Sequence, residues 1–289
     1  MHRLTVICGP TASGKSLAAL MLAEKSGACI INADAMQVYK QLPILTSSPS
    51  SQEQRQLKHY LYNYVDVTCY YNVEQYIQDT LSVLESLPKD KPPILVGGSG
   101  MYIGALLYGL HRLPNIDQQV RSKVQQELLE KGLSQVYAEL SKLAPESAKC
   151  FNPGDSKRIC RAYEVLLQTG KSIQSFYRQD NLYRPLQEYS INTIFLLPER
   201  DFLYKTCNAR FDEFINIGAV DEVGAILPYL EQLTVSSRKI LGLQQIASYL
   251  QGKISLPEAI ELSKQVTRNF AKRQITWFRH QLKNKQIIT

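Results

Sequence analysis

The segment Gly9-Pro10-Thr11-Ala12-Ser13-Gly14-Lys15-Ser16 contains residue types that together can hold a diphosphate. Glycines at this spacing let backbone N–H groups turn inward, and Lys15 would place a positive charge against the terminal phosphate. The Ser16 hydroxyl is suited to bind Mg2+ beside that phosphate. The spacing GxxxxGK[ST] therefore predicts a phosphate-binding loop (P-loop), for which ATP is the usual ligand.

Two further polar groups come directly after predicted strands and could act on a molecule held by this loop. Asp34 follows the strand predicted at Ala28–Asn32, and its carboxylate could accept a proton or simply cap the next turn. Ser99 lies in the glycine-rich turn after the strand predicted at Pro93–Val96. Its hydroxyl could stabilise charge on a departing oxygen, although the glycines also suit a tight turn without any catalytic role.

An acid that organises magnesium and water for hydrolysis is missing from the expected place. An ATPase carries such an acid at the end of an apolar strand. Here the clearest such strand, Ile94-Leu95-Val96, ends in glycines and Ser99. We therefore do not expect motor or switch chemistry.

These groups must be positioned by elements that alternate between strand and helix. We predict a strand at Leu4–Cys8 before the loop and a helix at Ser16–Lys25 after it. A helix at Tyr70–Leu87 precedes the Pro93–Val96 strand, and Thr193–Leu197 resumes the strand pattern later. This alternation predicts an α/β fold with a P-loop core, whose parallel sheet is flanked by helices and binds ligands at the strands' carboxyl ends.

The pattern changes in the middle of the chain, where residues 117–189 are polar, charged and helical in period. Breaks occur at Gly132, Pro145 and Pro153-Gly154. We therefore expect a mostly helical insertion domain over residues 117–189. It would interrupt a core of residues 1–116 and 190–289 that ends in long helices.

Composition indicates a soluble, cytoplasmic protein with an anionic partner. The 289 residues carry a net charge of +7, which favours polyanions. The six cysteines have no metal-binding spacing, which indicates reduced thiols, and no apolar run approaches the length of a membrane span. We expect no membrane association.

Two basic stretches are candidate contacts for such a polyanion. Lys264, Arg268 and Lys272 recur every four residues and would share one face of the C-terminal helix. Lys157 and Arg161 would form a like-charged i,i+4 pair in the insertion, which an anion would stabilise. Either face could instead be solvated with no partner.

The chain as a whole resembles the bacterial-type tRNA dimethylallyltransferase (tRNA isopentenyltransferase) family. The resemblance covers nearly the whole chain and rests on seven motifs in order. These are GPTASGKS at 9–16, ADAMQVY at 33–39, LVGGSGMY at 95–102, DSKRICRAYEVLLQTG at 155–170, ARFDEFINIGAVDEV at 209–223, KILGLQQIASYLQG at 239–252 and TRNFAKRQITWFR at 267–279.

The resemblance implies a reaction. A dimethylallyl group would pass from dimethylallyl diphosphate to N6 of the adenosine 3′-adjacent to the anticodon, in tRNAs reading codons that begin with U. Diphosphate would leave with the help of Mg2+, and the P-loop would hold the donor's diphosphate. The partner would be the anticodon stem-loop of tRNA, and we expect a monomer.

The resemblance also assigns residues. Asp34 would be the general base, Ser99 (in place of the usual threonine) would contact the bridging oxygen, and Lys15 completes the catalytic set. The donor diphosphate would be held by Gly9, Pro10, Thr11, Ala12, Ser13, Gly14, Lys15, Ser16 and Arg210, with Ser16 as the metal ligand. Contacts to tRNA would fall on Asp34, Ala35, Met36, Gln37, Ser99, Arg121, Lys157, Arg158, Ile159, Cys160, Arg161, Lys239, Ile240, Leu241, Gly242, Leu243 and Gln244, and the basic C-terminal helix adds Arg268, Lys272 and Arg273.

Two positions depart from the family pattern. Ala35 replaces the serine that usually follows the base, which removes one hydrogen bond. Leu243 replaces an aromatic residue, which puts stacking at that position in doubt. Neither position belongs to the expected reaction centre.

Three other functions share part of this pattern. A small-molecule kinase would use the P-loop for ATP and Asp34 to activate a hydroxyl, but it leaves both basic stretches unexplained. An isopentenyltransferase acting on free adenine nucleotides would not need the insertion. A non-catalytic RNA-binding module would not need Asp34 and Ser99 beside a P-loop.

Overall fold

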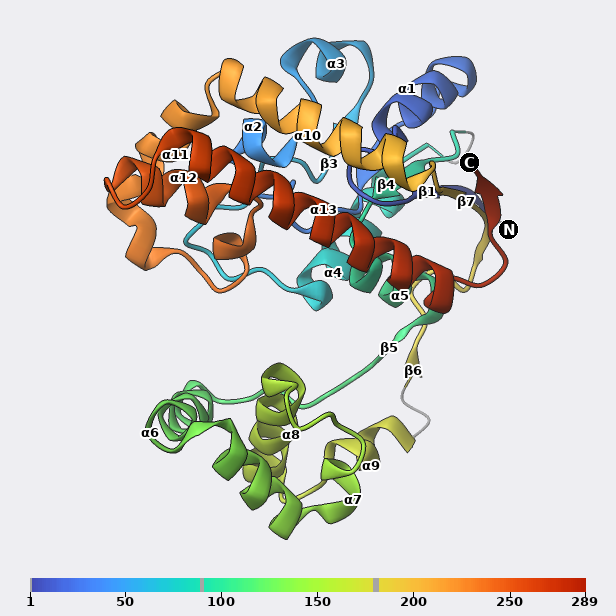
Figure 1. Ribbon diagram of the computed structural model, residues 1–289. Helices are drawn as coiled ribbons and strands as arrows, with labels where there is room; N and C mark the ends of the chain where they lie inside the picture. Colours follow the sequence, from blue (N-terminus) through green and yellow to red (C-terminus); the bar gives the residue numbers. More distant parts are fainter. Residues whose placement is uncertain (1, 89–90, 179–181) are drawn as a thin grey trace. The chain divides into compact units, whose positions relative to one another are not determined.

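The computed structural model describes residues 2–88, 91–178 and 182–289 (Figure 1). The chain divides into two compact units, one of Met1–Leu107 with Pro185–Thr289 and one of Tyr108–Arg184. We call the first the core unit and the second the insertion unit, which starts and ends earlier than the expected 117–189. Among the residues described, no helix combines the length and apolar character that crossing a bilayer requires.

A six-stranded parallel sheet forms the centre of the core unit, in the order β3-β2-β4-β1-β7-β8. Its strands are β1 (His2–Cys8), β2 (Ile30–Asn32), β3 (His59–Tyr60), β4 (Ile94–Gly97), β7 (Tyr189–Leu196) and β8 (Gln286–Ile288). The predicted α/β fold with a parallel sheet is therefore confirmed. The two edge strands, β3 and β8, were not expected from the sequence.

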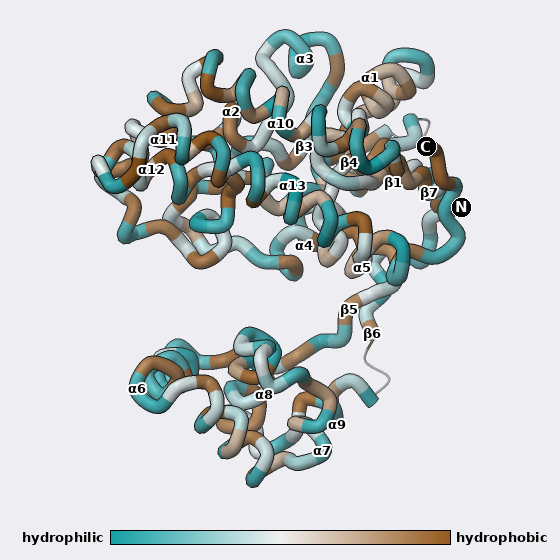
Figure 2. Tube along the Cα trace, in the orientation of Figure 1, coloured by the Kyte–Doolittle hydropathy of each residue, from teal (hydrophilic) through white to brown (hydrophobic). Residues whose placement is uncertain are grey.

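The central strands are apolar because both faces of the sheet are covered. Every residue of β2 and β4 is buried, as is typical of strands in parallel sheets. β1 is buried throughout its last three residues, and apolar stretches of β1 and β7 are brown in Figure 2.

The helices of the core unit follow the strands as predicted, with shifts at their ends. They are α1 (Lys15–Ser26), α2 (Pro43–Thr46), α3 (Ser51–Gln56), α4 (Val73–Ser86), α5 (Gly100–Tyr108, ending at the first residue of the insertion unit), α10 (Arg200–Asn216), α11 (Ala219–Ile226), α12 (Leu243–Leu250) and α13 (Leu256–Gln281). α4 begins at Val73 and not at Tyr70, because Asn72 and Gln75 form a capping box there. α13 packs against both α10 and α12.

The insertion unit is mostly helical and has its own apolar core. It contains α6 (Gln118–Leu143), α7 (Pro145–Ala148), α8 (Ser156–Thr169), α9 (Ile173–Arg178) and the antiparallel strands β5 (Leu110–His111) and β6 (Leu182–Tyr183). Val124, Leu140 and Ile159 are fully buried in its core. The predicted breaks are present: Gly132 has φ 77° and kinks α6, and Pro145 starts α7.

The strand order brings three loops to one edge of the sheet. β4 lies between β1 and β2, so the P-loop after β1, Asp34 after β2 and the glycine turn after β4 all leave neighbouring carboxyl ends. Ligands of α/β proteins bind at this edge, where strand order reverses.

Candidate active site

The P-loop is shaped by glycines that have different roles. A Cβ atom at Gly9 would lie 2.5 Å from the Leu196 carbonyl oxygen, so the close packing of the loop on β7 excludes a side chain there. Gly14 has open space around it but a φ of 84°, which favours glycine. Ala12 also has a positive φ, of 63°. Residues with positive φ in a loop of this kind let backbone N–H groups turn toward an anion.

Lys15 is held inside its own loop. Its Nζ donates a hydrogen bond of 2.6 Å to the Pro10 carbonyl oxygen. Burial lowers the pKa of Lys15 to about 8, and the positive charge of Arg210 acts in the same direction, whereas Asp34 opposes it. The loop therefore contains a desolvated ammonium group, which a phosphate would stabilise.

Arg210 reaches the same loop from α10. Its guanidinium donates a short hydrogen bond to the Thr11 hydroxyl oxygen and lies over the Phe214 ring, 5.6 Å from its centroid. Burial lowers the pKa of Arg210 from its usual value. Arg210 was assigned to the diphosphate site only through family resemblance, and the structure places it on the P-loop.

Asp34 is oriented by the residue two positions before it. The Asp34 N–H donates to Asn32 Oδ1 at 2.7 Å, while Asn32 Nδ2 donates to the Asp34 carbonyl oxygen at 3.0 Å. The Asp34 carboxylate accepts the Met36 N–H through Oδ1 at 3.0 Å. One carboxylate oxygen therefore caps the following turn, as the simpler interpretation expected.

The other oxygen of Asp34 lies where three parts of the chain meet. A Cβ atom built on Gly98 would lie 3.2 Å from Asp34 Oδ2, 3.2 Å from the Gly9 carbonyl oxygen and 2.3 Å from Gln274 Nε2. Only a residue without a side chain allows this approach. The carboxylate, the P-loop and α13 thus converge on the glycine turn.

Ser99 is joined to the loop that carries Asp34. Its Oγ accepts the Ala35 N–H at 2.7 Å, and its own N–H donates to the Ala33 carbonyl oxygen at 3.2 Å. A hydroxyl that accepts in this way keeps its own hydrogen as a donor. Ser99 is thus hydrogen-bonded to the residue that directly follows Asp34.

A cavity in the core unit collects several of the predicted groups. Thr11, Asp34 and Arg210 line it together with an apolar wall. The wall includes Leu45, Phe211, Phe214, Leu241 and Phe270. Lys15 and Ser99 do not line this cavity. Ser16 lines a different one, next to Glu53, His59 and Tyr62.

Three polar side chains at this site, the buried Gln274 and Asn32 and the half-buried Glu222, were not identified from the sequence. Gln274 accepts the Thr11 N–H at 2.8 Å and donates to the Gly98 carbonyl oxygen at 2.9 Å. Glu222 accepts the N–H groups of Ile44 and Leu45, at 2.7 and 2.9 Å, and so holds α2 at the cavity. Asn32 is the third of these side chains. The one signal in the sequence for its role was a polar residue inside a strand that is buried throughout.

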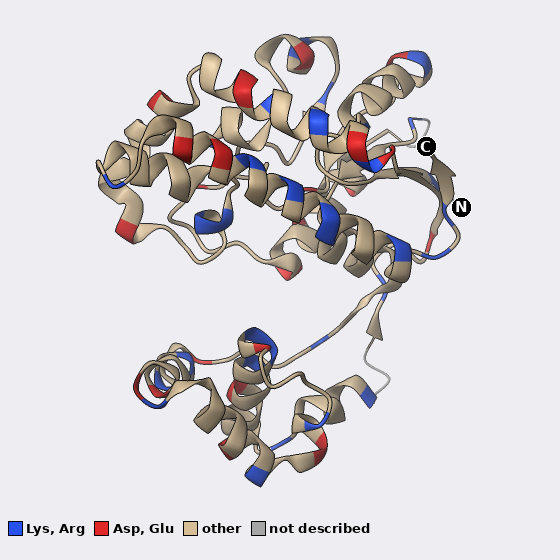
Figure 3. Cartoon of the chain, viewed as in Figure 1, with Lys and Arg blue, Asp and Glu red and all other residues tan. Residues whose placement is uncertain are grey.

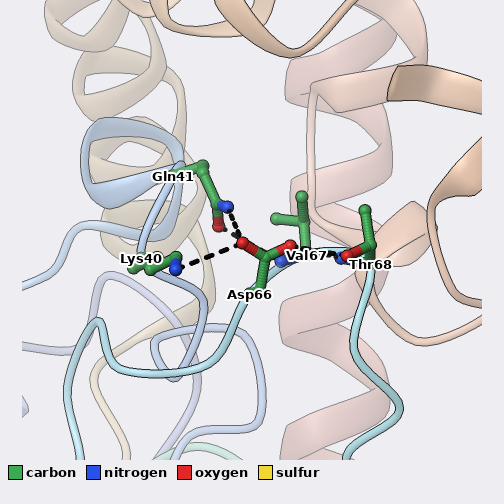
Figure 4. Close-up of polar contacts among 5 residues, drawn as sticks. All are labelled: Lys40, Gln41, Asp66, Val67 and Thr68. Carbon is green, nitrogen blue, oxygen red and sulfur yellow. Dashed lines mark hydrogen bonds and ion pairs between the residues drawn. The ribbon is translucent and has the colours of Figure 1, made fainter.

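Asp66 fixes part of the segment that follows Asp34 (Figure 4). Its carboxylate pairs with Lys40 at 3.2 Å and accepts hydrogen bonds from Gln41 and from the backbone and hydroxyl of Thr68. The bonds from Thr68 hold the pKa of Asp66 well below its usual range. Residues 65–68 therefore anchor the end of the loop that begins at Asp34.

The same residues also bind a segment far along the chain. The Ser237 hydroxyl, which is fully buried, donates to the Val67 carbonyl oxygen at 2.6 Å. The Val67 N–H donates to Gln41 Oε1 at 3.1 Å. Gln41 and Ser237 are thus both hydrogen-bonded to Val67; they lie a few residues from the segments 34–37 and 239–244 that are expected to contact tRNA.

Within 239–244 the side chains differ in accessibility. Lys239 and Gln244 are exposed, Leu241 lines the cavity, and Ile240 and Leu243 are buried. Leu243 is fully buried, so its position would not present a side chain for stacking. Gly242 has a φ of 85°, and a Cβ atom there would lie 2.6 Å from the Phe211 ring.

Figure 3 shows the basic residues of α13 as blue segments along the helix. Lys264 pairs with Asp212 at 2.7 Å, and Arg268 donates to Asn208 at 2.6 Å, so both are tied to α10. Lys272 and Arg273 are exposed. The expected cationic face is therefore partly neutralised near its beginning and open farther along.

In the insertion unit, the residues expected to contact tRNA also differ in how exposed their side chains are. Lys157 and Arg158 are exposed, although Arg158 pairs with Asp155 at 3.4 Å. Arg161 is half-buried and pairs with Glu164 at 3.5 Å. The side chains of Ile159 and Cys160 belong to the apolar core, and Arg121 is half-buried on α6. Lys157 and Arg158 are thus the exposed cations of this group, and Asp155 partly neutralises Arg158.

A family model, a sequence relative and two solved structures that match this chain are all of IPP or dimethylallyl transferases. The family model for IPP transferase matches residues 37–281. The tRNA dimethylallyltransferase of Orientia tsutsugamushi (strain Ikeda) is 40% identical, over 98% of this chain and 93% of its own length. The structure of a full-length tRNA isopentenylpyrophosphate transferase from Bacillus halodurans matches with TM-score 0.68 and 29% identity, covering 100% of this chain and 90% of that one. A eukaryotic dimethylallyltransferase acting on tRNA matches with TM-score 0.78 and 27% identity, over 96% of this chain and 70% of its own.

Proposed function

This chain belongs to the IPP transferase family, the tRNA dimethylallyltransferases, and we propose how its site performs the family's reaction. The enzyme transfers a dimethylallyl group to an adenosine of tRNA. We take the donor to be dimethylallyl diphosphate. The acceptor is N6 of the adenosine 3′-adjacent to the anticodon, in tRNAs reading codons that begin with U.

The P-loop holds the diphosphate of the donor. Lys15 exchanges the Pro10 carbonyl oxygen for a phosphate oxygen, and Arg210 stays beside Thr11 as a second cation. Their lowered pKa values support this role, because an anion would relieve the cost of burying two positive charges together.

Ser16 is the residue that would hold Mg2+. It is exposed in the first turn of α1, directly after Lys15, and it lines a cavity shared with Glu53. Magnesium at phosphate sites takes most of its ligands from phosphates and water, so one hydroxyl suits it. When bound, the ion neutralises charge on the departing diphosphate.

Asp34 is the general base. The N6 amine attacks C1 of the allyl group, the C1–O bond breaks, and its electron pair leaves with the diphosphate. The amine proton passes to Asp34 Oδ2. The observation that carries this proposal is the convergence at Gly98, where a methyl group would lie 3.2 Å from both Asp34 Oδ2 and the P-loop. A weak nucleophile needs this kind of positioning.

Ser99 donates its hydroxyl hydrogen to the bridging oxygen as the bond breaks. The hydrogen bond from Ala35 fixes its oxygen and leaves this donor available. The apolar wall formed by Leu45, Phe211 and Phe270 keeps water from the allylic carbon. Attack by the amine is therefore favoured over hydrolysis of the donor.

The acceptor base must leave the stack of the anticodon loop to reach Asp34. Segments 34–37 and 239–244 are proposed contacts for the loop, and Lys272 and Arg273 for phosphates. The insertion unit, with Lys157 exposed on α8, acts as a clamp on the tRNA. We propose that the enzyme acts as a monomer in the cytoplasm.

Transfer of labelled dimethylallyl diphosphate tests this function. The enzyme is incubated with unmodified tRNA, with AMP, or with no acceptor, and the tRNA is digested to nucleosides. We expect label in N6-dimethylallyladenosine from tRNA alone. Label in AMP but never in tRNA would indicate a free-nucleotide isopentenyltransferase. Transfer of phosphate from ATP to a metabolite, with no dimethylallyl transfer, would indicate a kinase.

A further inference from the structure

We propose that Gln274 is a positioning residue that sets the spacing between the diphosphate-binding loop and the glycine turn beside the base. Its Oε1 accepts the Thr11 N–H at 2.8 Å, and its Nε2 donates to the Gly98 carbonyl oxygen at 2.9 Å. These partners lie 263 and 176 residues away in the sequence. One side chain thus links two of the three loops at the edge of the sheet.

The bridge that Gln274 forms between the Thr11 N–H and the Gly98 carbonyl oxygen requires a neutral amide. Gln274 is only 5% exposed, so each of its polar atoms must find a partner inside the protein. An N–H faces one end of the side chain and a carbonyl oxygen faces the other. A carboxylate would have no hydrogen for Gly98, and an apolar side chain would leave both backbone groups unpaired.

The bridge acts on groups that the proposed reaction uses. Thr11 also receives the hydrogen bond from Arg210, so the position of Thr11 determines where that cation lies. At the other end, a Cβ atom on Gly98 would lie within 3.2 Å of Asp34 Oδ2. Gln274 therefore controls how far the leaving group lies from the base, an inference that rests on the proposed function.

The proposal predicts a loss in kcat without a matching loss in binding. A misplacement of about 1 Å between reacting groups costs on the order of 100-fold in rate. We expect Gln274→Glu and Gln274→Met to lower kcat by about 10- to 100-fold. KM for dimethylallyl diphosphate and Kd for tRNA should change by less than about threefold, because the cations and the loop remain. Gln265→Glu, on the exposed face of α13, is the matched control.

The pH dependence of Gln274→Glu separates a bridging role from a merely structural one. A protonated carboxyl group has one O–H donor and one carbonyl acceptor, so it reproduces the amide's two hydrogen bonds. The kcat of Gln274→Glu, divided by that of the wild type, should rise at least threefold from pH 8.5 to pH 6. Asp34, Lys15 and Arg210 face the same site in both proteins, so the division removes the pH dependence that the two proteins share. The ratio for Gln274→Met should stay flat.

The outcomes distinguish this inference from the function on which it rests. A wild-type enzyme that transfers no label to tRNA contradicts the proposed function. If the wild type is active, a kcat for Gln274→Met within threefold of it, or a flat pH ratio for Gln274→Glu, overturns the bridge. If Gln274→Met does not fold, as judged by thermal unfolding, the pH ratio of Gln274→Glu decides alone.

Discussion

Asn32 holds the backbone of Asp34 with two hydrogen bonds, one in each direction. Its Oδ1 accepts the Asp34 N–H at 2.7 Å, and its Nδ2 donates to the Asp34 carbonyl oxygen at 3.0 Å. The same Nδ2 also donates to the Leu61 carbonyl oxygen at 2.8 Å. The proposed base is therefore oriented by a fully buried amide at the end of β2.

Replacement of this amide should affect both stability and rate. Asn32→Asp keeps the acceptor for the Asp34 N–H but places a carboxylate against two carbonyl oxygens. We expect the free energy of unfolding to fall by about 2 kcal/mol or more, with a lower kcat. Denaturant titration measures the free energy of unfolding. Asn192→Asp, at an exposed position of β7, is the control and should change little.

Asp34→Asn tests the base directly. The amide has nearly the same shape and can still accept the Met36 N–H, so the loop should keep its conformation. We expect kcat to fall on the order of 100- to 10,000-fold, because no group takes the amine proton. The Kd for tRNA should remain within a few-fold. Asp201→Asn, exposed on α10, should retain full activity, and near-normal kcat in Asp34→Asn would assign the base elsewhere.

The lowered pKa of Lys15 predicts that diphosphate binding takes up a proton. The pKa is about 8 without the anion, and the bound anion should raise it. Affinity for dimethylallyl diphosphate should therefore fall about tenfold from pH 7 to pH 9, since Lys15 must be protonated in the complex. The last ionisation of a phosphate ester lies lower, near pH 6.

Calorimetry at pH 8 in two buffers of different ionisation enthalpy measures this proton uptake. Lys25→Met, an exposed change on the same helix, should behave as the wild type. Equal affinities at pH 7 and pH 9 would mean that Lys15 does not receive the diphosphate.

Glu222 should stabilise α2, which forms part of the cavity wall. Its carboxylate accepts the N–H groups of Ile44 and Leu45, and Leu45 lines the cavity. Glu222→Ala leaves both donors without this partner, so we expect the free energy of unfolding to fall by about 2 kcal/mol. Glu213→Ala, exposed on α10, should change it by less than about 0.5 kcal/mol. Equal stabilities for the two variants would show that α2 does not depend on Glu222.

The basic stretch of the insertion unit should contribute through Lys157 more than through Arg161, which pairs with Glu164. Lys157→Ala should weaken tRNA binding and reduce the slope of log Kobs against log salt by about 0.7 to 0.9, the value for one phosphate contact. Filter binding at several salt concentrations measures this. Lys142→Ala in the same unit is the control, and an unchanged slope would remove Lys157 from the interface.

Much of the fold could be predicted because it depends on local patterns. The P-loop, the buried strands β1 and β4 and the breaks at Gly132 and Pro145 each have a signal within a few residues. The start of α4 also had such a signal, the capping box of Asn72 and Gln75, which apolar periodicity alone misses. β3 and β8 are too short for a pattern and exist only because a neighbouring strand offers hydrogen bonds.

Residues of the site could be predicted from the sequence only where they belong to recognisable motifs. Asp34, Lys15 and Ser99 follow strands in recognisable segments. Gln274 and Glu222 did not stand out, because a glutamine or glutamate on a helix is usually exposed. Their roles arise from backbone groups 176 or more residues away. Only the packed structure shows such pairs.

The central claim is that the P-loop holds the leaving group of an alkyl transfer and not a nucleotide for hydrolysis. Parallel measurement of diphosphate release and of labelled tRNA, with no ATP present, tests it most directly. We predict one diphosphate released for each dimethylallyl group transferred, and almost none of either without tRNA. Transfer that requires ATP, or phosphate released from ATP in proportion to turnover, would contradict the account.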